Sequence, residues 1–350
     1  MPVSVASSSA VVDLCSAVEY LLLDIDGVVW SGDAVLPRIP EALEYLRAQH
    51  KQIRFISNNL IYSRGAIARQ FAHRGIRGVT TEEIYTVAYA SALYLRERFA
   101  QTEDGLVHGN VLIVGGPGIH DEVRAVLAPG YTTYGAELRD VPYRPDTVAA
   151  AMESPLLPPP DDPRVAELYK GRRVSLSEMN FVAVAVGLDF ELNMTKLACA
   201  AAVLQSNSNA VFVGTNPDPS DPAGANHVLL PASGAVLAAV TTAIGHAPDV
   251  MCGKPSPTLG HLLLEREARD GHRVDPRRMV MIGDRLMTDI QFGKGIGAQT
   301  ALVLSGAQKL EDVEALEANG AVDELPDLVL NSLADFLPLG AAEVVGSDVG

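Results

Sequence analysis

Residues 20–30 of the chain read Tyr-Leu-Leu-Leu-Asp-Ile-Asp-Gly-Val-Val-Trp: an apolar run stops at two aspartates, and a glycine follows. A continuous apolar run is typical of a strand that is buried on both faces of a parallel sheet. In open α/β sheets, ligands bind just beyond the carboxyl ends of such strands. Asp24 and Asp26 are alternate residues, so an extended backbone places both carboxylates on one face, where they repel unless a cation or strong donors offset their charge. By itself the stretch is equally an acidic strand end and turn, and its function depends on residues elsewhere.

The composition limits the classes of function. The 350 residues are 48% hydrophobic, which is enough for one large or two ordinary domains. The formal net charge of −16 argues against binding nucleic acid or an anionic membrane through bulk charge. The three cysteines form no CxxC pair, so neither a zinc cluster nor a disulfide scaffold is expected, and a reduced, cytoplasmic compartment fits best. No apolar run approaches the length of a membrane span.

Apolar, strand-like runs recur along the chain, and helical patterns fill the intervals between them. The runs cover residues 20–23, 53–56, 111–114, 180–187, 211–214, 279–282 and 300–304. In one interval, Ile39, Leu43 and Leu46 have helical spacing. Strands that alternate with helices are typical of a mostly parallel sheet, so we predict an α/β fold.

Two segments interrupt this pattern. Residues 139–173 contain prolines at 142, 145, 155, 158–160 and 163, which block helices and central strands. Such a long irregular excursion is functional, disordered or an insertion. The run 115–118, Gly-Gly-Pro-Gly, follows a predicted strand and is similar to a dinucleotide-binding turn, but its match to GxGxxG is incomplete. A tight strand-to-helix turn is the favoured explanation.

Polar residues follow several of the predicted strands or begin the next helices. They are Asp24 and Asp26, Ser57 and Asn58, Lys254, and Asp284 and Asp289. The ends of parallel strands meet at one edge of the sheet. Several carboxylates together suit a hard cation such as Mg²⁺, while a lysine and hydroxyl or amide donors suit a phosphate. An aspartate can attack phosphorus, and a second aspartate can act as acid and base.

These residues also resemble a known family. The haloacid dehalogenase (HAD) superfamily has four ordered motifs, and this chain resembles them at Asp24-Ile25-Asp26-Gly27, Ser57-Asn58-Asn59, Gly253-Lys254-Pro255 and Gly283-Asp284-Arg285-Leu286-Met287-Thr288-Asp289. The residues within and around these motifs are similar to those of the p-nitrophenylphosphatase-like branch, which includes phosphoglycolate phosphatase and pyridoxal phosphate phosphatase. The resemblance extends over roughly residues 20–335, apart from the proline-rich segment. It implies a Rossmann-like HAD core and an inserted α/β cap domain.

The resemblance implies catalytic roles for two aspartates and roles at the metal site for two more. Asp24 is expected to be the nucleophile and a Mg²⁺ ligand. Asp26 is expected to be the general acid and base, with its backbone carbonyl on the metal. Asp284 completes the metal site, and Asp289 orients that site or the lysine.

The resemblance implies substrate contacts as well. Ser57 and Asn58 are expected to hold the phosphoryl group, with Asn59 on the substrate side. Lys254 neutralises the nucleophile and the phosphate together. In the family the loop after residues 215–216 reaches into the active site. Here that loop carries two further acids, which we expect in a specificity loop: Asp218 and Asp221.

The resemblance also divides the chain. It implies a discontinuous core over residues 19–103 and 250–340 and a cap over 104–249, which contains the proline-rich insertion at about 139–173. We expect flexible tails over residues 1–18 and 341–350. A homodimer through the cap is implied, with no nucleic acid and no membrane as partner.

The function expected from the sequence is Mg²⁺-dependent hydrolysis of a small phosphorylated metabolite through an aspartyl-phosphate. Phosphoglycolate and pyridoxal phosphate are candidate substrates. Two alternatives stay open. One is a phosphotransferase that uses the same aspartate, and the other is a non-catalytic nucleotide-binding or scaffold protein that uses residues 115–118.

Overall fold

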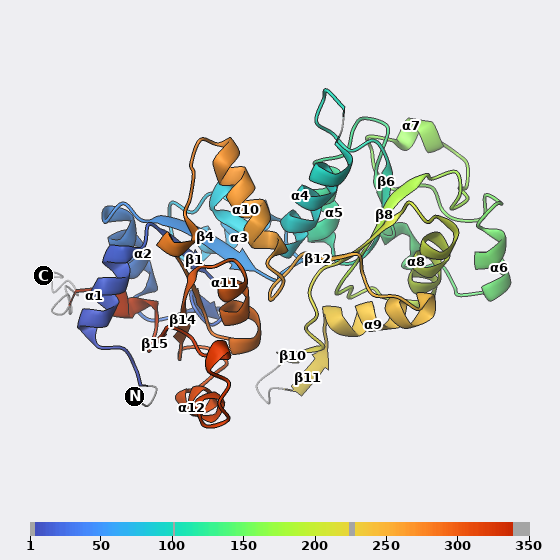
Figure 1. The fold of residues 1–350 in the computed structure, drawn as a ribbon. Helices are drawn as coiled ribbons and strands as arrows, with labels where there is room; N and C mark the ends of the chain where they lie inside the picture. Colours follow the sequence, from blue (N-terminus) through green and yellow to red (C-terminus); the bar gives the residue numbers. More distant parts are fainter. Residues whose placement is uncertain (1–3, 101, 224–227, 339–350) are drawn as a thin grey trace, which may run out of the picture. The chain divides into compact units, whose positions relative to one another are not determined.

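The computed structural model describes residues 4–100, 102–223 and 228–338, and its chain packs into two compact units (Figure 1). The first unit comprises residues 1–57, 68–84 and 263–350. The second comprises residues 58–67 and 85–262. Both are built from parallel strands and helices, so the predicted α/β fold is confirmed.

The first unit is organised around the apolar strand at residues 20–23. Its sheet has the order β15-β14-β13-β1-β4-β5. The strands are β15 (Leu328–Leu330), β14 (Gln299–Val303), β13 (Met279–Gly283), β1 (Tyr20–Leu23), β4 (Gln52–Ser57) and β5 (Ile84–Thr86). Strand β1 pairs in parallel with β13 and β4, and all of its residues are buried. This position explains its unbroken apolar sequence, because both faces of the strand contact other parts of the core.

Helices complete this unit. They are α1 (Ser8–Ala17), α2 (Ile39–Ala48), α11 (Gln291–Gly295) and α12 (Leu310–Ala318), with α3 (Arg64–His73) and α10 (Thr258–Arg269) crossing the limits between units. A short hairpin, β2 (Trp30–Ser31) with β3 (Ala34–Val35), follows β1. Ile39, Leu43 and Leu46 are buried on α2, as their spacing predicts.

The predicted loose tail over residues 1–18 is wrong for α1. Ser7 caps this helix by accepting a hydrogen bond from the Ala10 N–H, and Val11 and Leu14 are buried. The serines and alanines that led to the prediction of a tail have structural roles here: Ser7 caps the helix, and alanine favours helix formation. The predicted tail over residues 341–350 lies outside the described residues.

The second unit has its own parallel sheet, with the order β12-β9-β8-β6-β7. The strands are β12 (Val250–Met251), β9 (Val211–Gly214), β8 (Phe181–Val186), β6 (Asn110–Val114) and β7 (Thr133–Tyr134). Helices α4 (Val87–Phe99) and α5 (Pro117–Arg124) pack on each other, as do α8 (Met194–Ser206) and α9 (Ser233–Ile244). An antiparallel pair, β10 (Ser220–Ala223) and β11 (Val228–Pro231), follows β9. None of the described helices in either unit is long and apolar enough to cross a membrane.

The turn at residues 115–118 contacts the segment Leu60–Tyr62. The N–H groups of Gly118 and Ile119 donate to the carbonyls of Ile61 and Leu60, at 2.9 and 3.1 Å. A Cβ at Gly118 would lie 2.5 Å from the Tyr62 backbone. The donors that a helix start offers to a phosphate are therefore already used by the chain itself. This argues against nucleotide binding at this turn.

The same contact explains where the units divide. Packing assigns residues 58–67 and 85–262 to one unit, whereas the sequence predicts a cap over 104–249. Helix α4 joins the second unit because it packs on α5, and residues 58–67 join it through their contact with the start of α5.

The proline-rich segment is ordered, so disorder is excluded as its explanation. It contains α6 (Pro145–Ala150) and α7 (Ala166–Tyr169), and its apolar residues belong to the core of the second unit. Asp162 is only 2% exposed and accepts hydrogen bonds from Thr132 Oγ1 (2.6 Å) and Arg164 Nη2 (3.0 Å). Burial raises the pKa of Asp162, but the bonds from Arg164 and Thr132 outweigh it and lower that pKa to about 2.

Replacing this carboxylate tests the anchoring of the segment. Asp162→Ala should lower the free energy of unfolding by about 2–4 kcal/mol in a denaturant titration at neutral pH, because buried donors lose a charged acceptor. The folded-state pKa lies below the unfolded value of about 3.9, so the stabilisation is present above that value and is lost as pH falls towards 2. The exposed neighbour is the control: Asp161→Ala should leave stability unchanged. Equal stability of Asp162→Ala and wild type would contradict the anchoring role.

Candidate functional site

Three polar residues stand at the carboxyl ends of three neighbouring strands. Asp24 follows β1, Asp284 follows β13, and Ser57 is the last residue of β4. The register pairs Leu23 with Ile282 and with Phe55, and the Asp24 N–H donates to the Ile282 carbonyl at 2.9 Å. The sheet therefore brings these residues to the same edge, as the sequence predicts for parallel strands.

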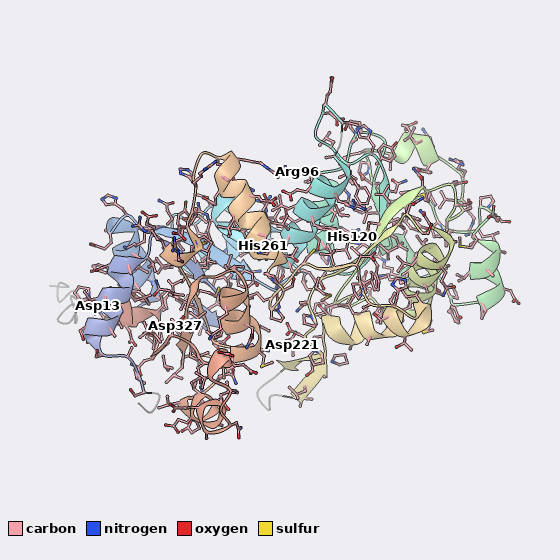
Figure 2. All side chains as sticks on the ribbon, in the orientation of Figure 1. Asp13, Arg96, His120, Asp221, His261 and Asp327 are labelled. Atoms are coloured by element: carbon pink, nitrogen blue, oxygen red, sulfur yellow. The ribbon has the colours of Figure 1, made fainter. Side chains whose placement is uncertain are left out.

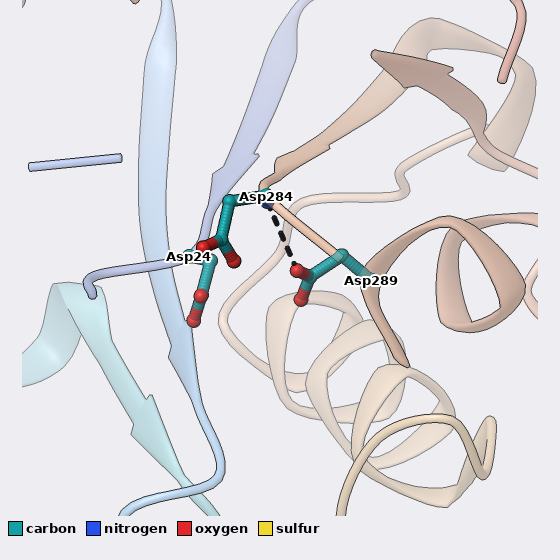
Figure 3. Close-up of side chains that lie close together, drawn as sticks. All are labelled: Asp24, Asp284 and Asp289. Carbon is teal, nitrogen blue, oxygen red and sulfur yellow. Dashed lines mark hydrogen bonds between the residues drawn. The ribbon is translucent and has the colours of Figure 1, made fainter. Parts of the chain in front are cut away.

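Three carboxylates lie together at this edge (Figure 3). Oxygens of Asp24, Asp284 and Asp289 all lie within 4.8 Å of one another. Asp284 is 5% exposed and Asp289 is fully buried. Carboxylates this close and this far from water repel each other strongly. The group therefore suits a hard divalent cation, which binds oxygen ligands and offsets their charge.

The loop after β13 holds Asp289 in place. Its Oδ2 accepts the N–H groups of Asp284 (3.1 Å) and Arg285 (3.0 Å), and residues Leu286–Ile290 form a π-helical turn. A Cβ at Gly283 would lie 2.2 Å from the Asp289 side chain, so this approach requires glycine. These bonds support an orienting role for Asp289, and its oxygen also belongs to the carboxylate group itself.

Backbone groups and glycines surround Asp284. Its Oδ2 accepts the Ala307 N–H at 2.7 Å. A Cβ at Gly27 or at Gly306 would lie 2.3 or 2.1 Å from that same oxygen. Gly27 also has φ +83°, a backbone conformation that other residues rarely adopt. Both glycines therefore allow the Asp284 carboxylate to occupy its position.

Asp26 is placed differently from the other aspartates. Its Oδ1 accepts a hydrogen bond from Trp30 Nε1 at 3.0 Å, and its carboxylate lies outside the group of three. The indole fixes the side chain apart from the candidate metal ligands. This separation supports a role in proton transfer rather than a side-chain bond to the metal.

The second unit holds the other predicted residues. Lys254 is 2% exposed, and its backbone is bonded to the Asn58 side chain. Asn58 Oδ1 accepts the Lys254 N–H at 2.9 Å, and Asn58 Nδ2 donates to the Lys254 carbonyl at 3.0 Å and to Asp218 Oδ2 at 3.1 Å. Both hydrogens of this amide nitrogen are used within the second unit, and the predicted contact of Asn58 with the phosphoryl group stays a prediction. The sequence does not predict the bonds of Asn58, because their partners are distant along the chain.

Comparison with known proteins adds the family. A model of haloacid dehalogenase-like hydrolases matches residues 21–127, and a HAD-hydrolase-like model matches residues 251–336. Chronophin from Rattus norvegicus is 33% identical over 329 residues, which cover 94% of this chain and 90% of chronophin. The chain belongs to the haloacid dehalogenase-like hydrolases.

Further relatives define the branch of this family. Glycerol-3-phosphate phosphatase from Mus musculus is 32% identical, covering 93% of this chain and 92% of its own. The solved p-nitrophenyl phosphatase from Archaeoglobus fulgidus has a TM-score of 0.66 and 25% identity, with 91% of this chain and 97% of its own covered. A glycerol phosphate phosphatase from Mycobacterium tuberculosis, solved with magnesium, has a TM-score of 0.65 and 26% identity over 92% of this chain and 77% of its own. The predicted p-nitrophenylphosphatase-like branch is confirmed, and the chain is a phosphatase.

Other predicted residues of this phosphatase have different surroundings. Asn59 Oδ1 accepts the N–H groups of Ile61 (3.0 Å) and Tyr62 (2.9 Å), which makes it a turn-forming side chain. Asp221 lies on β10 and is exposed (Figure 2), whereas Asp218 is half-buried and bonded to Asn58. The two acids of the predicted specificity loop therefore do not act alike.

The segment after β14 was not predicted as part of the site. Ser305 Oγ donates to the Gly27 carbonyl at 2.8 Å, next to the Gly306 and Ala307 contacts with Asp284. Its signal was present in the sequence, because a Ser-Gly pair follows a predicted strand in the same way as the other site residues. Cys252, by contrast, is fully buried, and burial raises the pKa of its thiol to about 12, which excludes a thiolate nucleophile.

Gly306→Ala tests the geometry of the carboxylate group. The new Cβ would meet Asp284 Oδ2 at 2.1 Å and displace it, so the Mg²⁺ concentration for half-maximal p-nitrophenyl phosphate hydrolysis should rise about tenfold or more. Val322→Ala is the control, because it changes a side chain of the first unit that is 64% exposed. An unchanged Mg²⁺ requirement in Gly306→Ala would contradict the assignment of Asp284 as a ligand.

Proposed function

We propose that this phosphatase is Mg²⁺-dependent and hydrolyses a small phosphorylated metabolite through an aspartyl-phosphate on Asp24. The observation that carries the proposal is the meeting of Asp24, Asp284 and Asp289 within 4.8 Å at the carboxyl edge of a parallel sheet. Three carboxylates in so small a volume, two of them buried, offer the oxygen ligands that Mg²⁺ prefers. Asp24 and Asp284 would hold the ion, and the ion when bound would offset charge on the phosphoryl oxygens.

The aspartates divide the reaction between them. An Asp24 oxygen attacks phosphorus, and the bond from phosphorus to the leaving oxygen breaks. Asp26, protonated at that moment, gives its proton to the leaving oxygen. It then takes a proton from water, whose oxygen attacks phosphorus and releases inorganic phosphate and Asp24. The Trp30 N–H supports this role because it holds the Asp26 carboxylate in one position.

The donors named from the sequence remain predictions in this scheme. Ser57 would donate its hydroxyl to the phosphoryl oxygens, and its place at the end of β4, beside Asp24, supports this. Lys254 would neutralise the phosphoryl charge. Its burial and the bonds on its backbone support this, because an ammonium on a fixed backbone loses less entropy on binding.

The substrate class follows from the relatives. Chronophin, a glycerol-3-phosphate phosphatase and a phosphoglycolate phosphatase from Arabidopsis thaliana each match more than 90% of the chain. A small phosphomonoester is therefore proposed, with phosphoglycolate, pyridoxal phosphate and glycerol 3-phosphate as the first compounds to assay. Phosphate release from each should require Mg²⁺ and stop with EDTA. Release onto an added alcohol in place of water would favour the phosphotransferase alternative.

Asp24→Asn tests the nucleophile. Loss of the attacking oxygen should lower kcat for p-nitrophenyl phosphate by on the order of 10³-fold or more, with an unchanged circular dichroism spectrum. Asp13→Asn is the matched control, because Asp13 is an exposed aspartate on α1 of the same unit (Figure 2), and it should retain wild-type activity. Near-normal turnover by Asp24→Asn would overturn the mechanism.

The homodimer through the cap is also a proposal. A set of exposed apolar residues in the second unit supports it. Phe190 and Leu192 precede α8 and Met194 begins it, and they are 77, 38 and 54% exposed. Light scattering should give about twice the chain mass of 37.1 kDa, and Phe190→Glu should reduce it to one chain. A monomeric wild-type protein would contradict the dimer.

A further inference from the structure

The carboxamide of Asn58 is bonded at every polar hydrogen. Its oxygen accepts the Lys254 N–H, and its nitrogen donates to the Lys254 carbonyl and to Asp218 Oδ2. The orientation of this amide follows from its partners, because a backbone N–H can only donate while a carbonyl and a carboxylate can only accept. Asn58 therefore holds the Lys254 backbone with two hydrogen bonds, and Asp218 uses the remaining donor.

Asp218 connects this clamp to the end of β9. The same Oδ2 that accepts from Asn58 also accepts from Asn216 Nδ2 at 2.6 Å. Asn216 is 4% exposed, and its amide nitrogen makes a charge-assisted hydrogen bond to this carboxylate. Loss of the carboxylate would leave two amide groups short of an acceptor.

The chain before Lys254 is confined by the same network. The Gly253 N–H donates to the Thr215 carbonyl at 2.6 Å. A Cβ at Gly253 would lie 2.7 Å from Asn58 Oδ1 and 2.9 Å from the Thr215 carbonyl oxygen. The backbone at residues 253–254 thus lies between Asn58 on one side and the end of β9 on the other. Side-chain movement at Asn58 would move the Lys254 backbone with it.

We propose that Asp218 is a positioning residue of the phosphatase reaction: it fixes Asn58, and Asn58 fixes the backbone of Lys254. The specificity role that the sequence predicts for Asp218 stays a prediction, and the positioning role is proposed in addition to it. The positioning role rests on the proposed function, in which Lys254 binds the phosphoryl group. Small displacements of such a group lower both binding and turnover.

Two substitutions at position 218 separate positioning from general stability. Asp218→Ala removes the acceptor, so KM for p-nitrophenyl phosphate and the inhibition constant of inorganic phosphate should both rise about tenfold, with a lower kcat. Asp218→Asn keeps an acceptor oxygen and should stay within about threefold of wild type. Asp146→Asn, which removes an exposed carboxylate on α6, is the control and should match wild type. A purely structural defect would reduce the amount of active enzyme and leave both constants unchanged, which would overturn the proposal.

A double variant tests whether the two residues act through one path. Asp218 acts through Asn58, so adding Asp218→Ala to Asn58→Ala should produce little further loss in kcat/KM. Losses that multiply would contradict the proposal. If wild type fails to hydrolyse phosphomonoesters, the proposed function itself fails. If wild type is active and Asp218→Ala keeps wild-type constants, only the positioning role fails.

Discussion

Mutual repulsion among Asp24, Asp284 and Asp289 is the constraint that the first unit must satisfy. Their oxygens lie within 4.8 Å of one another, and the two later residues are buried. Two backbone N–H groups fix one oxygen of Asp289, and Gly27 and Gly306 make room for Asp284. Backbone donors offset part of this charge, and a divalent cation bound by the same oxygens would offset more of it, as the proposed function requires.

The second unit fixes the backbone of a buried lysine. Asn58 accepts the Lys254 N–H and donates to the Lys254 carbonyl. Asp218 supplies the single charged group of this clamp, and β9 anchors it through Asn216.

Local patterns predicted the central strands such as β1, because its burial is a property of a short stretch, but they did not predict the short strands β5 and β15 at the edges of the first sheet. The polar residues that follow the central strands led to the predicted site. Contacts between distant residues were not predictable in this way. The role of Asn58 depends on residues 160 and 196 positions away. The order of the proline-rich segment depends on Asp162, whose partner Thr132 lies 30 positions away. Helix α1 was missed because the serines and alanines at its start resemble a tail, and because only Val11 and Leu14 of its residues are buried.

The most direct test of the central claim is a crystal structure of the protein with Mg²⁺ and beryllium trifluoride, which mimics a phosphoryl group on an aspartate. The account predicts that beryllium is bonded to an oxygen of Asp24 and that the metal lies between Asp24 and Asp284, with Asp289 beside it. An adduct on another residue, or a metal bound away from these carboxylates, would contradict the account.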